Sequence, residues 1–247
     1  MVTVTVFIIY NETASYWLPY GILLSIMKKM RHFFKTTQGQ FLGSVGLIIV
    51  LLFAYYFYAM STTTKDVATA DVVISKTDHV RGAKDGKVTL VVFGDFQCPA
   101  CAAWEPMIRQ VVTDNKDTLK MSFRQFPLMQ IHRNALLAAK ASEAAALQGK
   151  FWEMHDILYD KQEEWGESLT ARQFILTYAN TLGLDQKKFI SDLDSKPVEE
   201  KILAELKEGV SLGVQGTPTF FLNGKKLEGV SNLAEFNKAV KEAAAGK

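Results

Sequence analysis

Cysteine is nearly absent from this chain, which has only two in 247 residues, Cys98 and Cys101, with two residues between them. A structural zinc site normally takes four Cys or His ligands, and the sequence has no second cysteine pair. His132 and His155 are far apart in the sequence and lack the spacing of zinc ligands. We therefore expect no metal.

The position of the two thiols also argues against a stabilising crosslink. A disulfide between them would close a loop of about four residues and remove roughly 2 kcal/mol of freedom from the unfolded chain, compared with nearly 5 kcal/mol for a long loop. An inert structural disulfide is one interpretation of Cys98 and Cys101, and a redox-active pair is the other.

An excess of charge of one sign is lacking as well. The formal net charge is +2, and from residue 71 onward we count 23 Lys plus Arg against 24 Asp plus Glu, a difference of −1. A near-neutral domain without a basic face gives no reason to expect nucleic acid as a partner.

Charge is completely missing from Phe41 to Met60, a run of twenty residues. As a helix this run would be about 30 Å long, the thickness of the hydrocarbon core of a bilayer. We predict an uncleaved transmembrane anchor. The alternatives are a cleaved signal peptide, with a weak cleavage site at Ala68 to Ala70, and a buried soluble helix.

Basic residues gather just before this run, at Lys28, Lys29, Arg31 and Lys35. This asymmetry predicts that the amino-terminal flank stays in the cytoplasm and that the chain from Ser61 onward lies outside it, where disulfides persist. We therefore expect a tail with a basic cytoplasmic flank over 1–40, the anchor over 41–60, a linker over 61–70 and an exported domain over 71–247. Residues 1–26 are interpreted as an interfacial tail or an overlong translation start, with a poor second span as the alternative.

The exported domain alternates between β and α patterns. Strands are predicted over 87–93 and 119–126, with a helix between them that starts near the thiols. A helical block over about 128–214 follows, and then a strand whose Asn223-Gly224 pair predicts a tight hairpin. Ser231 is the expected cap of a closing helix. This order predicts an α/β domain.

A thiol pair at a helix start favours redox chemistry. The free N–H groups and the dipole of the first turn stabilise a thiolate at the first cysteine, so we expect the pKa of Cys98 to lie below that of a free thiol. Cys101, one turn further in, should be more buried and have an ordinary pKa. We infer that Cys98 exchanges with substrates and that Cys101 resolves the mixed disulfide.

The sequence from His79 to Lys247 resembles the DsbA-like branch of the thioredoxin-fold thiol:disulfide oxidoreductases, which includes membrane-anchored bacterial members. The segments that carry the resemblance are "FGDFQCPAC", "FRQFPL", "QGKFWEMHDILY" and "QGTPTFFLNG". It implies a thioredoxin-like fold with an inserted helical subdomain, preceded here by the predicted transmembrane helix. It also implies that Thr217 and a cis Pro218 lie beside the thiols and line the substrate groove.

Other residues are candidates for tuning the thiols or for packing around them. Strongly oxidising relatives often carry Pro-His between the cysteines, whereas this chain has Pro99-Ala100, and alanine offers the thiolate no charge. Glu105 matches a family acidic residue that helps to move protons, or is an exposed helix glutamate. Asp95 is interpreted as a solvated loop residue. Packing is the expected role of three further residues, Trp152, Met154 and His155.

These observations predict a membrane-anchored extracytoplasmic enzyme that passes its Cys98–Cys101 disulfide to dithiols of exported proteins. A membrane oxidase of the quinone-linked type would restore the disulfide, and no dissociable cofactor is needed because the electrons reside on the two sulfurs. The alternatives are a reductase or isomerase of the same fold, and a non-catalytic binding module.

Overall fold

A computed structural model describes residues 25, 28–29, 37–62 and 72–246. The chain divides into two compact units, residues 1–65 and residues 66–247. The predictions made for residues 1–24, for Arg31 and Lys35, and for most of the linker concern residues outside this described part.

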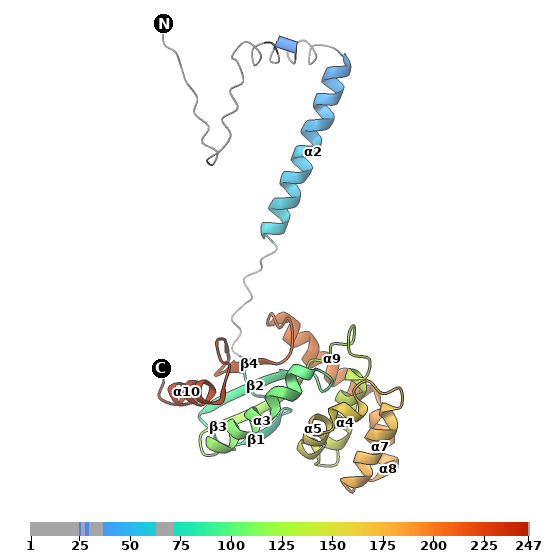
Figure 1. The fold of residues 1–247 in the computed structure, drawn as a ribbon, viewed down its shortest axis with the longest axis vertical. Coiled ribbons are helices and arrows are strands. Elements are labelled where there is room, and N and C mark those ends of the chain that lie inside the picture. The colour runs from blue at the N-terminus through green and yellow to red at the C-terminus, as the bar shows by residue number, and fades with distance from the viewer. Residues whose placement is uncertain (1–24, 26–27, 30–36, 63–71, 247) are drawn as a thin grey trace, which may run out of the picture. The chain divides into compact units, whose positions relative to one another are not determined.

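The second unit is built on a five-stranded sheet in the order β1-β3-β2-β4-β5 (Figure 1). Its strands are β1 (His79–Gly82), β2 (Val88–Gly94), β3 (Leu119–Gln125), β4 (Thr219–Leu222) and β5 (Lys225–Lys226). The central strands β2 and β3 are parallel and are joined by helix α3 (Pro99–Asp114), whereas the other neighbours are antiparallel. The predicted strand–helix–strand unit is thus confirmed.

The two faces of β2 belong to different hydrophobic clusters. Leu90 and Val92 pack with Ile108 of α3 and Phe236 of α10 (Leu233–Ala244). On the other face, Val91 and Phe93 belong to a cluster with Phe126 and Phe221, against which Leu206 of α9 (Lys196–Ser211) packs. Both faces of the strand are therefore covered, as its nearly continuous apolar sequence predicts.

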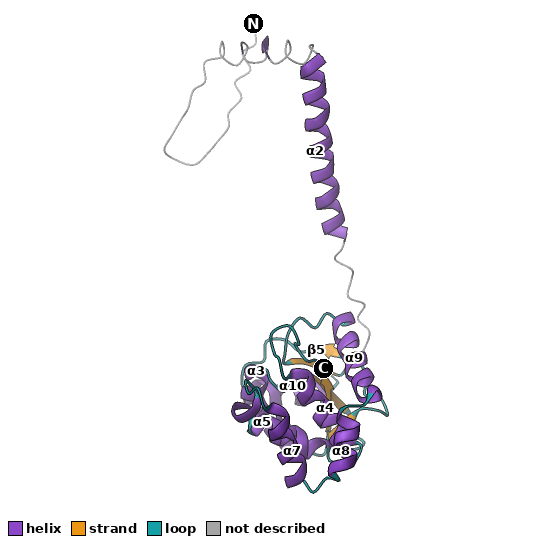
Figure 2. Ribbon diagram, turned by 90° about the vertical axis from the view of Figure 1, so that its right-hand side faces the viewer, coloured by secondary structure: helices purple, strands orange, loops and turns teal. Residues whose placement is uncertain are grey.

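Between β3 and β4 the chain forms the predicted helical insertion. It contains α4 (Ala135–Ala146), α5 (Phe151–Asp160), α6 (Gln162–Trp165), α7 (Ala171–Thr181), α8 (Gln186–Leu193) and α9. Helices α4, α5, α7 and α8 gather beside the sheet in Figure 1, and Figure 2 shows helices around the strands. Small side chains permit close packing of α4, where Ala138, Ala141 and Ala144 are fully buried.

The carboxyl-terminal hairpin forms where it was predicted. Asn223 and Gly224 both have positive φ, 47° and 83°, as a two-residue hairpin turn requires. The predicted cap of the last helix was wrong by one residue. Asn232 is the cap, and its side chain accepts the main-chain N–H of Glu235 at 3.0 Å, while Ser231 bonds to the Glu235 carboxylate.

The first unit contains helix α2, Thr37–Thr62, which includes the whole uncharged run. Its side chains from Val45 to Tyr58 are exposed. The predicted membrane span is not confirmed, because no helix within the described residues combines the length and apolar character needed to cross a membrane.

Candidate functional site

The two thiols lie where β2 gives way to α3. Cys98 is the N-cap of α3, with an extended backbone, and Pro99 occupies the first turn, where its missing N–H costs nothing. Both cysteines are free thiols and both are buried, Cys98 with 7% and Cys101 with 3% of its surface exposed. Cys101 is the more buried of the two, as predicted.

Cys98 is the acidic thiol of the pair. The hydrogen bond from the Cys101 thiol is the largest cause and, against the opposing effect of burial, lowers the pKa of Cys98 from 9.0 to about 5. The Thr217 hydroxyl and the main-chain N–H groups of Cys101 and Ala100 add smaller contributions. The predicted direction is confirmed, although the partner thiol matters more than the helix-start donors on which the prediction rested.

Cys101 behaves in the opposite way. Burial raises its pKa far above the ordinary value, and the hydrogen bond and negative charge of Cys98 raise it further. The expectation of an ordinary pKa for Cys101 was therefore wrong. The cause is the burial of its sulfur beside a neighbour that ionises first, and two thiolates in contact repel each other.

The Thr217-Pro218 peptide bond is cis, as the family resemblance implied. It lies beside the first thiol, because the Cys98 thiol donates to the Thr217 carbonyl with an Sγ–O distance of 3.4 Å. The Thr217 hydroxyl is buried and, among the described residues, has no hydrogen-bond partner. It is therefore free to turn toward the thiolate once Cys98 ionises.

Asp95 is not the solvated loop residue considered above, because only 1% of its surface is exposed. Its Oδ1 accepts the Gln97 main-chain N–H at 2.8 Å. Its Oδ2 accepts the Leu128 main-chain N–H at 2.9 Å and lies 2.7 Å from His132 Nδ1. The carboxylate therefore connects the loop between β2 and α3 (residues 95–98, the thiol loop) to the segment after β3. Sequence reasoning missed this contact, because it joins residues more than thirty positions apart.

Further residues of the helical insertion bind the same loop. Gln97 accepts the Asn134 main-chain N–H at 2.7 Å and donates to Glu167 at 3.0 Å. The Gln162 amide donates to the carbonyls of Phe96 and Cys98 at 2.7 and 3.0 Å. The insertion is thus part of the site's framework.

Glu105 is buried, with 3% of its surface exposed, so the alternative of an exposed helix glutamate was wrong. It accepts Arg109 Nε at 3.0 Å and lies 3.8 Å from His155 Nδ1. The ligand atoms of Glu105, His155 and Asp156 lie within 4.8 Å of one another, but Arg109 already pairs with both carboxylates and Arg81 pairs with Asp156 as well. Met154 and His155 are completely buried, in agreement with the packing role expected of them.

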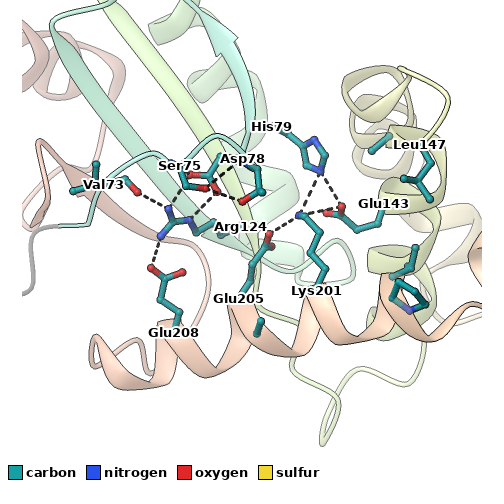
Figure 3. Close-up of a pocket in the computed structure, with 15 residues that line it drawn as sticks. Val73, Ser75, Asp78, His79, Arg124, Glu143, Leu147, Lys201, Glu205 and Glu208 are labelled. Atoms are coloured by element: carbon teal, nitrogen blue, oxygen red, sulfur yellow. Dashed lines mark hydrogen bonds and ion pairs between the residues drawn. The ribbon is translucent and has the colours of Figure 1, made fainter.

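A separate cavity of about 750 Å³ lies beside β1, β3, α4 and α9 (Figure 3). Its floor is a network of ion pairs in which buried Glu143 accepts His79 Nε2 at 2.8 Å and Lys201 Nζ at 3.0 Å. Neither cysteine lines this cavity. Every charged group of the network has a partner of opposite sign, so we assign the cavity no ligand.

Residues 74–242 match a family model whose description is thioredoxin. The chain belongs to the thioredoxin family. Within this family, the chain is a thiol:disulfide oxidoreductase of the DsbA-like type, and its structural neighbours include enzymes of this kind.

Two solved structures illustrate this likeness. A thioredoxin-like oxidoreductase from Silicibacter pomeroyi DSS-3 is 26% identical, with a TM-score of 0.59, over 74% of this chain and 98% of that one. The thiol-disulfide exchange protein alpha-DsbA2 from Wolbachia pipientis is 25% identical, with a TM-score of 0.60, over 68% of this chain and 88% of that one.

Curated relatives carry a different name. A protein named Na(+)/H(+) antiporter NhaA 1 from Salinispora arenicola is 42% identical over 170 residues, which are 68% of this chain and 25% of that protein. This thioredoxin-family chain thus spans about a quarter of the length of the curated relatives it matches.

Proposed function

We propose that this enzyme oxidises pairs of thiols in exported proteins with its Cys98–Cys101 disulfide. A substrate thiolate attacks the Cys98 sulfur, the Cys98–Cys101 bond breaks, and Cys101 leaves and takes up a proton. The second substrate thiolate then attacks the substrate sulfur of the mixed disulfide and expels the Cys98 thiolate. Two electrons pass from the substrate to the enzyme, and the substrate gains one disulfide.

One observation carries the oxidising direction: the low pKa of Cys98, about 5. An acidic thiol leaves a mixed disulfide quickly, and stabilising the reduced form makes the disulfide a stronger oxidant. Pro99 starts the helix that supplies the main-chain donors, and Ala100 contributes one of them. A reductase would instead be helped by a more stable disulfide.

The redox potential tests this direction. The full chain is equilibrated with glutathione buffers of known ratio, and its reduced fraction is measured after acid quenching. We expect a potential nearer to the value of about −120 mV quoted for DsbA than to the value of about −270 mV quoted for thioredoxin. A potential close to that of thioredoxin would favour the reductase instead.

We also propose that the catalytic domain lies outside the cytoplasm, held at the membrane by residues 41–60. The proposal is supported by the uncharged run, by the basic residues before it and by the exposed apolar side chains of α2. A membrane-impermeant thiol reagent should label Cys98 in intact, mildly reduced cells. Labelling that requires a broken membrane would exclude this location.

A membrane oxidase of the quinone-linked type is the proposed partner that restores the disulfide. It follows from the proposed location, since reduced enzyme held at a membrane needs an electron acceptor there. In cells depleted of quinone, the Cys98–Cys101 pair should accumulate in its reduced form. An unchanged redox state would point to a different oxidant.

A further inference from the structure

Asp95 is the acidic residue of the thiol loop, and both oxygens of its carboxylate accept hydrogen bonds. It accepts two main-chain N–H groups, those of Gln97 and Leu128, and faces His132 Nδ1. Its side chain is completely buried, whereas 14% of the His132 side chain is exposed. Since a buried carboxylate is costly unless its oxygens are hydrogen-bonded, this arrangement fixes the orientation of Asp95.

The main chain of the same residue affects both cysteines of the redox pair. The Asp95 carbonyl accepts the Cys98 N–H at 3.1 Å. The Asp95 main-chain N–H lowers the pKa of Cys101, against the larger opposing effect of burial, and so favours the thiolate. Cys101 must become a thiolate before it can attack Cys98 in a mixed disulfide. When Asp95 is held in place, its main-chain N–H is therefore a hydrogen-bond donor that favours negative charge on the Cys101 sulfur.

We propose that the Asp95–His132 pair is the positioning unit that holds this main-chain donor against Cys101 and so sets the rate of the resolving step. The inference rests on the proposed exchange roles of Cys98 and Cys101. Asp95 and His132 act through the main chain of the thiol loop, because the hydrogen bonds of their side chains within the described residues go to main-chain N–H groups and to each other.

An amide cannot replace this carboxylate. One oxygen of Asp95 faces the N–H of Gln97 and the other faces the N–H of Leu128. In Asp95→Asn, either orientation of the side chain turns its NH2 group toward a main-chain N–H, so that two donors meet. The variant keeps the shape of the side chain but loses one of the hydrogen bonds to Gln97 and Leu128. A change in rate therefore reports the loss of hydrogen bonding rather than a change in packing.

The experiment follows the two steps of oxidation of the reduced full chain by glutathione disulfide. In the first step the Cys98 thiolate attacks a glutathione sulfur, which forms a mixed disulfide and releases one glutathione thiolate. In the second step Cys101 attacks Cys98, which forms the internal disulfide and releases the other glutathione. Acid quenching and mass measurement at successive times give both rates, and Cys101→Ala, which stops after the first step, calibrates the mixed disulfide.

We expect Asp95→Asn to slow the second step by about 10- to 100-fold, the range for a reacting group misplaced by about 1 Å, and to change the first step by less than about threefold. His132→Ala should also slow the second step. His132→Asn should restore most of the rate, because its amide can place a donor near the position of Nδ1.

The chain contains a matched control in Glu143, another buried carboxylate paired with a histidine, whose partners His79, Gln125 and Lys201 lie outside the thiol loop. Glu143→Gln should lose stability without slowing the second step. The inference is overturned if Glu143→Gln and Asp95→Asn slow this step equally, if Asp95→Asn exchanges like the wild type, or if the two His132 variants behave alike. Failure of the wild-type chain to exchange at all would instead overturn the proposed function.

Discussion

The acidity of Cys98 should make the stability of the reduced protein depend on pH. The folded protein lowers the pKa of this thiol from 9.0 to about 5, so between these values the unfolded chain holds a proton that the folded chain has released. Stability must therefore rise as the pH increases from 5 toward 9, and this contribution is lost as the pH falls through 5. The oxidised protein has no thiol to titrate and serves as the internal reference.

The size of the effect follows from the same values. One pH unit corresponds to about 1.4 kcal/mol, so at pH 7, two units above the folded pKa, the thiolate should stabilise the reduced form by about 3 kcal/mol. The entropic effect of the disulfide on the unfolded chain, about 2 kcal/mol, favours the oxidised form and does not vary with pH. The difference between the two forms isolates the thiolate.

Urea unfolding of both forms between pH 4 and 8 measures this difference. This pH range excludes a contribution from Cys101. Because the folded protein raises the pKa of Cys101, ionisation of this thiol lowers the stability only above pH 9.0, the ordinary pKa of a thiol. We expect the reduced form to gain about 3 kcal/mol over the oxidised form between pH 4 and pH 7. A constant difference across this range would refute the assignment of Cys98 as a stabilised thiolate.

Three further substitutions test the site. Cys101→Ala removes the main cause of the acidity of Cys98, so the pKa of Cys98, followed by alkylation rate against pH, should rise from about 5 toward 9.0, and mixed disulfides through Cys98 should accumulate in cells. Ala100→His should lower the pKa of Cys98 further, as measured by thiolate absorbance, because a histidinium charge would lie beside it. Gly94→Ala should destabilise the fold by about 1–3 kcal/mol in urea, because the new methyl would overlap the Phe123 ring, whereas Gly216→Ala, whose methyl meets nothing within 4 Å, should not.

Local chemistry made part of the fold predictable. A short, nearly continuous apolar run rich in valine favours a strand covered on both faces, and Pro99 beside the thiols marked the start of α3. The Asn223-Gly224 pair fixed the hairpin, because these residues tolerate positive φ. The cis bond before Pro218 came from the family resemblance, since no local pattern indicates it.

Contacts between distant segments could not be predicted in this way. Strand β1 has only four residues and no alternating pattern, and it forms because the edge of β3 offers a partner, with His79 opposite Phe123. The burial of Asp95 depends on Leu128 and His132, which reach it only after the chain has passed through α3 and β3. Glu105 looks exposed in its helix until α5 covers it.

The opposite pKa values of the two thiols also determine how the redox potential varies with pH. Between pH 5 and 8, reduction should place one proton on Cys101 and leave Cys98 as a thiolate, so two electrons arrive with one proton. For a two-electron couple this gives a slope of about 30 mV per pH unit, whereas below pH 5 two protons should give about 59 mV. Burial and the charge of Cys98 keep Cys101 protonated, and the nearby Tyr159, whose pKa burial raises well above its ordinary value, adds no charge. Glutathione equilibria from pH 4 to 8 would reveal the change in slope, and a slope that stayed near 59 mV would mean that Cys98 keeps its proton.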